Sequence, residues 1–274
     1  MRTGGSAGCG GRGTDFPETL LRRSDHSPGQ GSLAIIGLGP GRAEGMTAGA
    51  LEALGQAEVI VGYHVYIELI RNLIGSRAVV SSGMTQELER CREAVRLALA
   101  GRRVAVVSSG DPGVYGMAGL VLEVLHQAAP ESRLPVQVIP GVTAATAAAA
   151  LLGAPLMHDF AVISLSDRLT PWDLIARRLE MAAGGDFVTV LYNPRSHGRR
   201  SQLQQAGEIF LKHRPPETPV GVVRNAGRGG EEVWVSSLQK FAGLPVDMLS
   251  TVIIGNSRTR VLSGRLVTPR GYQI

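Results

Sequence analysis

Cysteine is nearly absent from this chain of 274 residues, which has only Cys9 and Cys91. Two cysteines cannot build a framework of several disulfides, nor the thiolate clusters that hold structural zinc. Cys9 lies in a glycine-rich stretch and Cys91 lies within a helical pattern, so we interpret Cys91 as a buried core thiol. Such sparse use of cysteine fits a reducing compartment, and we expect a cytoplasmic protein.

Long apolar runs are missing as well. No stretch approaches the roughly 18 apolar residues that a bilayer-spanning helix needs. The first residues also lack the apolar segment of a secretory signal. We therefore expect no membrane partner. None of the six histidines has a second ligand at metal-binding spacing, so we predict no structural metal.

Aromatic residues make up only 4% of the chain, and 28 Lys and Arg residues stand against 23 Asp and Glu, a net charge of +5. The arginines are scattered rather than gathered into a stripe. Proteins that bind nucleic acids usually combine stacking aromatic side chains with a basic groove. We therefore expect no nucleic-acid partner. The modest positive excess still favours an anionic ligand, such as a polycarboxylate.

Apolar residues are plentiful, at 44% of the chain, which is enough to build one large or two medium domains. Residues 1–31 are glycine-rich and have no apolar period, and we interpret them as a disordered leader. Over residues 32–153, short β-forming runs alternate with helical patterns, which predicts an α/β domain with a mostly parallel sheet and helices on both faces. Residues 154–274 predict a second α/β domain with a mixed sheet, because its last strands are joined by short turns.

Two helix boundaries carry specific predictions. Thr85 is expected to be the N-cap of a helix whose apolar face is Leu88, Cys91, Val95 and Leu99. A second helix is expected to open at residues 196–200 and to run to about residue 213.

The segment Val104–Gly116 has the clearest pattern in the chain. Four β-forming residues run into the turn Gly110-Asp111-Pro112-Gly113, and a helical pattern resumes at Met117. Open α/β sheets bind their ligands at the carboxyl ends of such strands, so a carboxylate there suggests a binding site. Alternatively, Asp111 only fixes the turn by accepting hydrogen bonds from nearby N–H groups.

The loop Gly37-Leu-Gly-Pro-Gly41 follows another predicted strand and suggests a dinucleotide site. Dinucleotide folds need a third glycine where the helix packs on the strand and an acidic residue at the end of the second strand. Here Arg42 follows Gly41, and the second strand ends in Gly62-Tyr63-His64. Pro40 also lacks an N–H group for a phosphate. We conclude that the loop is shaped for close approach to something other than pyrophosphate.

Five predicted strand-end loops share an order and spacing that resemble those of the tetrapyrrole (corrin and porphyrin) methyltransferases, which transfer methyl groups from S-adenosylmethionine. The loops are residues 37–41, 110–116, 140–145, 192–195 and 224–227. The resemblance covers residues 33–268. Four stretches most resemble the enzymes that methylate carbon 17 of precorrin-3B and contract its ring during cobalamin synthesis: residues 61–66, 108–116, 191–196 and 251–257.

This resemblance implies a fold of two unequal α/β domains, usually paired as a homodimer, with S-adenosyl-L-methionine in the cleft between them. A tetrapyrrole would lie in a trough lined mainly by the first domain. A ligand with sulfonium and ammonium groups benefits from a nearby carboxylate and from loops without bulky side chains. The implied cofactor-binding residues are Pro40, Gly110, Asp111, Val114, Thr143, Ala144, Asn193 and Ala226.

The resemblance assigns catalytic residues less directly than cofactor-binding residues. Related uroporphyrinogen methyltransferases have an acidic residue near position 63, and this sequence has none there. Tyr63 and His64 are therefore the candidates for acid–base work or for orienting the macrocycle, although His64 fits an ordinary hydrogen-bonded loop histidine equally well. The candidates for binding substrate carboxylates are Arg195, Arg199 and Arg228, each of which also fits an ordinary surface position.

The resulting hypothesis is methyl transfer from S-adenosylmethionine to carbon 17 of precorrin-3B, or of its cobalt form, with contraction of the ring. Three alternatives remain open at this point. The first alternative is another tetrapyrrole methyltransferase. The second is a ribosomal RNA ribose methyltransferase or diphthine synthase of the same fold, and the third is a non-catalytic tetrapyrrole-binding module. The basic excess permits an RNA substrate, but the particular motifs argue against it.

Overall fold

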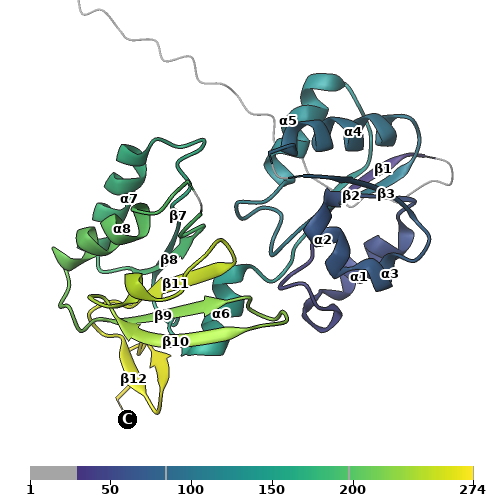
Figure 1. The fold of residues 1–274 in the computed structure, drawn as a ribbon. Helices are drawn as coiled ribbons and strands as arrows, with labels where there is room; N and C mark the ends of the chain where they lie inside the picture. The colour runs from purple at the N-terminus through teal and green to yellow at the C-terminus, as the bar shows by residue number, and fades with distance from the viewer. Residues whose placement is uncertain (1–29, 84, 197, 274) are drawn as a thin grey trace, which may run out of the picture.

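A computed structural model describes residues 30–83, 85–196 and 198–273. Residues 1–29 of the predicted leader lie outside this part of the chain. The described residues form two α/β units, each built on a five-stranded sheet, and the chain passes from the first to the second near α6 (Figure 1). Within the described ranges, no helix is long and apolar enough to cross a bilayer.

The first sheet is parallel throughout, which confirms the prediction for this part of the chain. Its strand order is β3-β2-β4-β1-β5, so β1 and β4 lie side by side near the centre and their carboxyl ends meet at one edge. The strands are β1 (Ser32–Gly37), β2 (Val59–Tyr63), β3 (Ala78–Ser82), β4 (Arg103–Ser108) and β5 (Val136–Ile139).

Helices cover both faces of this sheet because its strands are apolar on both sides (Figure 1). Val61 and Val106 pack against α4 (Glu87–Leu99) and α5 (Ala118–Ala128), whereas Ile60 and Val107 pack against the helices of the opposite face. Full burial of each such side chain stabilises the fold by roughly 1.5–3 kcal/mol. The helical segments of the opposite face are α1 (Ala48–Gln56), α2 (His64–Leu69) and α3 (Arg71–Ile74), preceded by the short η1 (Ala43–Gly45).

The second sheet is mixed, as predicted. Its order is β10-β9-β11-β8-β7, and only the β7–β8 pair is parallel. Helices α7 (Trp172–Gly184) and α8 (Gln202–Leu211), with η2 (Phe241–Gly243), cover one face. The strands are β7 (Phe160–Ser164), β8 (Val188–Tyr192), β9 (Pro219–Arg224), β10 (Glu232–Ser237) and β11 (Ser250–Ile254). A small sheet contains β12 (Arg260–Leu262), β13 (Arg265–Val267) and β6 (Gly153–Ala154).

Helix α6 (Ala144–Leu152) covers the other face of the second sheet. Its alanines and Leu152 pack against Val190, Val223 and Ile253. The helix approaches the sheet so closely that a Cβ added at Gly221 would clash with the Leu152 side chain. A boundary after residue 153 places α6 with the first domain in sequence, although its buried contacts are with the second sheet. The domain bounds stay a prediction.

Two local predictions were wrong. Thr85 is not the N-cap of α4, because Gln86 occupies that position and Thr85 has a left-handed φ of 73°. Helix α8 begins only at Gln202, because Ser196 and Arg199 pair through two backbone hydrogen bonds that make a tight turn instead of a helix. On α4, Cys91 and Val95 are buried as expected, but Leu88 and Leu99 are exposed.

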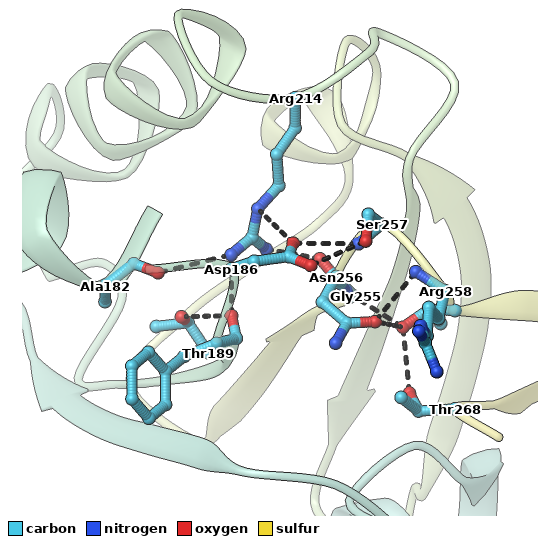
Figure 2. A network of polar contacts seen from close by, with 11 residues as sticks. Ala182, Asp186, Thr189, Arg214, Gly255, Asn256, Ser257, Arg258 and Thr268 are labelled. Atoms are coloured by element: carbon cyan, nitrogen blue, oxygen red, sulfur yellow. Dashed lines mark hydrogen bonds and ion pairs between the residues drawn. The ribbon is translucent and has the colours of Figure 1, made fainter. Parts of the chain in front are cut away.

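Arg214 organises a buried polar network that includes Gly255, just beyond the carboxyl end of β11 (Figure 2). Its guanidinium donates to the carbonyl oxygens of Phe187 (2.6 Å), Ala182 (3.3 Å) and Gly255. Asp186 Oδ1 lies 3.9 Å from Arg214 Nε. The Asp186 carboxylate also accepts two hydrogen bonds from Ser257, which lies in the loop after β11. The Gly-Asn-Ser stretch after β11 therefore has a structural role.

Candidate active site

The loops that follow β1, β4 and β5 are packed directly against one another at the carboxyl edge of the first sheet. Gly39 and Gly110 exchange two backbone hydrogen bonds of 3.0 and 2.8 Å, and both have left-handed φ values, of 61° and 66°. A Cβ added at Gly141 would clash with the carbonyl oxygen of Gly110. Glycine is favoured at Gly39 and Gly110 by their left-handed φ, and at Gly39 and Gly141 also because an added Cβ would meet backbone atoms.

The carboxylate of Asp111 joins two of these loops. Its Oδ1 accepts from the N–H of Gly113 at 2.8 Å, and its Oδ2 accepts from the N–H of Gly141 at 3.1 Å. The first bond fixes the turn after β4, and the second ties that turn to the loop after β5. Each carboxylate oxygen can accept a further hydrogen bond, so these contacts leave acceptor capacity for a ligand.

The second sheet contributes two loops in which asparagine takes a left-handed conformation. Asn193, just after β8, has a φ of 51° and donates from Nδ2 to Ser164 Oγ at 3.0 Å. Asn225, just after β9, has a φ of 54° and donates from Nδ2 to the carbonyl oxygen of Gly230 at 3.2 Å. Asparagine tolerates this conformation because its side chain bonds locally.

Two tyrosines connect the loops of the first sheet to the second unit. Tyr192 OH lies 2.6 Å from Thr143 Oγ1 and accepts from the N–H of Ala145 at 2.7 Å. Burial raises the pKa of the Tyr192 phenol, so it stays protonated at neutral pH. Tyr115 OH donates to the carbonyl oxygen of Val162 and accepts from the N–H of Ser164, each at 3.2 Å. These contacts hold the two units at a defined spacing.

Arg228 crosses from the turn after β9 to the first unit. Its Nε donates to the carbonyl oxygen of Pro40 and its Nη2 donates to Ser109 Oγ, both at 2.6 Å. Burial lowers the pKa of this guanidinium, and the Tyr66 phenol acts in the opposite direction. The neighbouring Gly227 has a φ of 68°, and a Cβ added there would lie 2.7 Å from Pro40 Cβ.

These loops enclose a cleft of about 180 Å³ between the two units. All eight residues predicted to bind cofactor line this one cleft, with Pro40, Gly110 and Asp111 coming from the first unit and Asn193 and Ala226 from the second. Further lining residues were not predicted as cofactor-binding, among them Tyr66, Ser109, Tyr115, Tyr192, Arg228 and Met248–Thr251.

The residues predicted for acid–base chemistry lie beside the cleft. Tyr63 ends β2 and is half-buried, while His64 begins α2 and is exposed. Neither belongs to the cleft lining, but Tyr66 does, and its ring centroid lies 5.2 Å from that of Tyr63 in an edge-on arrangement. Tyr66 follows Tyr63 by three residues, so the two share one face of a helical turn, and this spacing is the sequence signal that could have indicated Tyr66 as a cleft residue. The roles of Tyr63 and His64 stay predictions.

Of the three arginines predicted to meet carboxylates, only Arg228 lines the cleft. Arg199 is buried and donates to the carbonyl oxygen of Asn193 at 3.1 Å, so it supports the loop after β8. Arg228 also borders a second cavity of about 400 Å³, next to Arg42 and Asn72. Within the described residues, no group of three His, Cys, Asp or Glu side chains is placed to hold a metal ion.

The cleft thus offers backbone groups at glycine corners, one carboxylate, one guanidinium and several phenols, which suits a polar organic ligand. The profile of the family of Tetrapyrrole (Corrin/Porphyrin) Methylases matches residues 32–242. The chain belongs to this family. The predicted family and the predicted two-domain α/β fold are therefore confirmed, and this methylase is an enzyme.

Two curated relatives are similar to this methylase over most of its length. It is 50% identical over 242 residues to "Probable cobalt-factor III C(17)-methyltransferase" of Salmonella typhimurium, covering 88% of this chain and 100% of the relative. It is 49% identical over 246 residues to "Cobalt-factor III methyltransferase" of Priestia megaterium, covering 89% of this chain but only 46% of the relative. The methylase therefore spans about half the length of the second relative.

Solved structures share the fold. The structure described as "Crystal structure of the methyltransferase CobJ" is 38% identical, with a TM-score of 0.82, over 88% of this chain and 100% of that one. A uroporphyrin-III C-methyltransferase from Thermus thermophilus, complexed with S-adenosylhomocysteine, is 25% identical, with a TM-score of 0.64, over 82% of this chain and 92% of that one.

Proposed function

We propose that this methylase transfers a methyl group from S-adenosyl-L-methionine to carbon 17 of precorrin-3B, or of its cobalt-containing counterpart, with contraction of the ring, in cobalamin synthesis. The observation that supports this most is the convergence of all eight predicted cofactor-binding residues on one cleft between the units. The relatives named for C(17) methylation of cobalt-factor III support the position of the methyl group.

The residues of the cleft fit the cofactor. The carboxylate of Asp111 has acceptor capacity left for an ammonium group, and Gly39 and Gly110 line the cleft without side chains. In this proposal Gly110, Asp111, Val114, Thr143 and Ala144 bind the methionine end. Asn193 and Ala226 bind the adenosine through backbone groups, and Pro40 approaches both the cofactor and the substrate trough. The use of this cofactor by a family member is supported by the Thermus thermophilus complex.

When bound, the cofactor supplies a methyl group on a positively charged sulfur, whose bonding electrons stay with sulfur as the new carbon–carbon bond forms. The substrate carbon provides the electron pair for that bond, and the macrocycle gives up one proton to restore its charge. No covalent nucleophile is needed. The main contribution of the chain is therefore to align the two carbons in a cleft that excludes water, held at fixed width by Tyr115, Tyr192 and Arg228.

Tyr63 and His64 remain our candidates for acid–base work at the macrocycle, because they lie at the carboxyl end of β2, one helical turn from the cleft-lining Tyr66. The test is substitution of each side chain: Tyr63→Phe and His64→Asn should each lower kcat without changing the affinity for S-adenosylhomocysteine. An unchanged kcat in both variants would remove them from the mechanism.

The proposal extends to assembly and location. We infer a cytoplasmic homodimer with a small-molecule tetrapyrrole as its partner, and neither nucleic acid nor membrane. Sedimentation equilibrium tests the dimer directly. Salt-sensitive binding of ribosomal RNA would instead favour an RNA substrate.

The decisive experiment is a reaction with two possible substrates. The protein is incubated with S-adenosylmethionine and either precorrin-3B or cobalt-factor III, and the products are analysed by mass spectrometry. We expect one substrate to gain the mass of one CH2 unit, because a methyl group is added and one proton is lost, with a change of the absorbance spectrum that marks the contracted ring. Binding of both tetrapyrroles without methylation of either would support a non-catalytic binding module.

A further inference from the structure

A second cavity lies beside the cleft. Its volume is about 400 Å³, and it is lined by the chain just after Pro40, by α2 and α3, and by the turn after β9. Arg228 lines both cavities, and the consecutive residues Pro40 and Gly41 line the cleft and the second cavity, respectively. The two cavities are therefore neighbours, and a ligand too large for the cleft has an adjoining space to enter.

The guanidinium of Arg228 is the charged group that the two cavities share. Its Nε and Nη2 donate to the Pro40 carbonyl oxygen and to Ser109 Oγ, which are both neutral acceptors. Within the described part of the chain, Arg228 has no ion pair and its Nη1 has no hydrogen bond. A partly buried charge without a counter-ion is poorly compensated, so an anion beside Arg228 would be stabilising.

Two further hydrogen-bond donors line the second cavity. Arg42 follows the glycine loop after β1, Asn72 lies on α3, and both residues are exposed. Neither side chain has an ion pair or a hydrogen bond to another described residue. Among the described residues of the lining, Glu44 is the one acidic side chain, against Arg42 and Arg228. The cavity therefore has a net positive charge and free donors.

This set of side chains suits a carboxylate. A guanidinium donates two parallel N–H groups to the two carboxylate oxygens, and an asparagine amide supplies two further N–H donors. A tetrapyrrole is a flat ring whose acidic arms project beyond its edge. A ring with its reacting carbon in the cleft therefore carries its arms outside the cleft, and the second cavity adjoins the cleft at Arg228.

We propose that the second cavity is a carboxylate subsite, in which Arg42, Asn72 and Arg228 bind one acidic arm of the tetrapyrrole. This inference rests on the proposed function. The arm supplies the counter-charge that Arg228 lacks, and its attachment fixes which edge of the ring faces the cofactor. Because the arm does not react, the subsite acts on the binding of the substrate and leaves the chemical step unchanged.

The test changes the charge of the subsite in both directions at exposed positions, so that the variants keep the fold. The variants are Arg42→Met, Arg42→Lys, Asn72→Asp and Glu44→Gln, and the matched controls at other exposed positions are Arg260→Met and Glu131→Gln. Arg228 is left unchanged, because it also holds the loops of the cofactor site.

Three measurements are made on each variant. Calorimetry provides the affinity for S-adenosylhomocysteine, and fluorescence titration of the saturated complex provides the affinity for uroporphyrin. Steady-state kinetics with the corrin substrate provide kcat and KM. Circular dichroism checks the fold.

We expect Arg42→Met and Asn72→Asp to weaken uroporphyrin binding and to raise KM by about threefold to tenfold, because the first removes a charged donor and the second adds repulsion. Glu44→Gln should strengthen uroporphyrin binding by about twofold, since it removes the negative charge of the lining. Arg42→Lys should recover part of the loss, and added salt should reduce every change by screening. The affinity for S-adenosylhomocysteine, kcat and both controls should stay unchanged.

The arm is an acetate or a propionate side chain of the ring. Coproporphyrin distinguishes the two, because it has methyl groups in place of the acetate arms. If the cavity binds a propionate, the variants change the affinities for coproporphyrin and uroporphyrin alike. If it binds an acetate, only the affinity for uroporphyrin changes.

Folded Arg42→Met and Asn72→Asp variants with unchanged uroporphyrin affinity and KM would overturn the subsite and leave the proposed function standing. An equal loss of S-adenosylhomocysteine affinity in these variants would also overturn it, since the cavity would then support the cofactor loops. Weaker uroporphyrin binding in Glu44→Gln would contradict the argument from charge. Failure of the unmodified protein to bind a tetrapyrrole and to methylate it would remove the subsite and the proposed function together.

Discussion

The Nε of Arg228 donates a hydrogen bond of 2.6 Å to the carbonyl oxygen of Pro40, across the cleft that separates the two units. The two residues are 188 positions apart in the sequence. Proline has no N–H group, so this carbonyl is the only backbone hydrogen-bonding group that Pro40 offers. Through it, the second unit fixes the loop after β1, while Nη2 fixes Ser109 in the loop after β4.

Loss of this contact should loosen the cofactor site. We expect Arg228→Met to lower the affinity for S-adenosylhomocysteine about tenfold or more, because hydrogen bonds from a charged donor contribute about 1.5–3 kcal/mol. Arg228→Lys should recover little, since one ammonium cannot reproduce two donors held in a planar fork. Calorimetry measures the affinity, with Arg260→Met as the control at an exposed position. Equal affinity in Arg228→Met would show that the contact is dispensable.

Asp111 has two interpretations that mutation can separate. We expect Asp111→Ala to weaken the binding of S-adenosylhomocysteine and to leave the overall fold intact. If its charge attracts the ammonium group, Asp111→Asn should lose as much affinity as Asp111→Ala. If Asp111 acts by holding the loops through Gly113 and Gly141, the affinity of Asp111→Asn should lie between those of the unmodified protein and Asp111→Ala. The reason is that the asparagine side-chain oxygen keeps one of the two hydrogen bonds.

The control for this series is Asp159→Ala, because the Asp159 side chain is largely exposed. Calorimetric titration and circular dichroism of each variant report affinity and fold. Unchanged affinity in both Asp111 variants would remove Asp111 from the site.

Arg214 should matter for stability and little for catalysis. Arg214→Met leaves the carbonyl oxygen of Gly255 without a donor, and it removes one of two hydrogen bonds to the carbonyl oxygens of Ala182 and Phe187. We expect a loss of about 2–4 kcal/mol in the free energy of unfolding, given that an unsatisfied buried polar group costs about 1–3 kcal/mol. Urea denaturation measures this loss. Because the network lies at the opposite end of β11 from the cleft-lining Ser250, S-adenosylhomocysteine affinity per folded molecule should not change.

Cys91 should make the free energy of unfolding decrease as the pH rises in the alkaline range. Burial raises the pKa of its thiol from the usual 9.0 to about 11. Between these values the unfolded chain loses the proton and the folded chain keeps it, so unfolding is favoured as pH rises. The two-unit difference corresponds to at most about 2.7 kcal/mol.

The pH effect is measured by urea denaturation at pH 8 and near pH 11, in the unmodified protein and in Cys91→Ala. Burial also raises the pKa of Tyr66 and Tyr192, which contribute in the same direction. The informative quantity is therefore the difference in pH dependence between the two proteins. Identical pH dependence would contradict a buried, protonated Cys91.

The first sheet could be predicted because its strands follow simple rules. The run Val104–Val107 is apolar on both faces and ends in a glycine turn, which is typical of a central parallel strand, and it forms β4. The predicted starts of α4 and α8 were wrong because local backbone conformation outweighed the helix propensity of the sequence. Ser196 and Arg199 pair with each other and delay α8, and Thr85 takes a left-handed conformation that no capping pattern indicates.

Contacts between distant residues could not be predicted. Helix α6 is alanine-rich, so its sequence has no polar face to show which sheet it covers. Tyr66 and Arg228 meet the same cleft from opposite units, which no spacing in the sequence reveals. The eight cofactor residues were identified through a family resemblance that located loops, whereas the surrounding phenols and the contacts of Arg228 required side-chain positions.

A structure of the protein in complex with S-adenosylhomocysteine is the most direct test of the central claim. We predict one molecule in the cleft, contacted by the Gly110–Asp111 turn of the first unit and by Ala226 of the second, with its sulfur on the side of Pro40 and Tyr66. A ligand bound by one unit alone, or bound outside this cleft, would contradict the account.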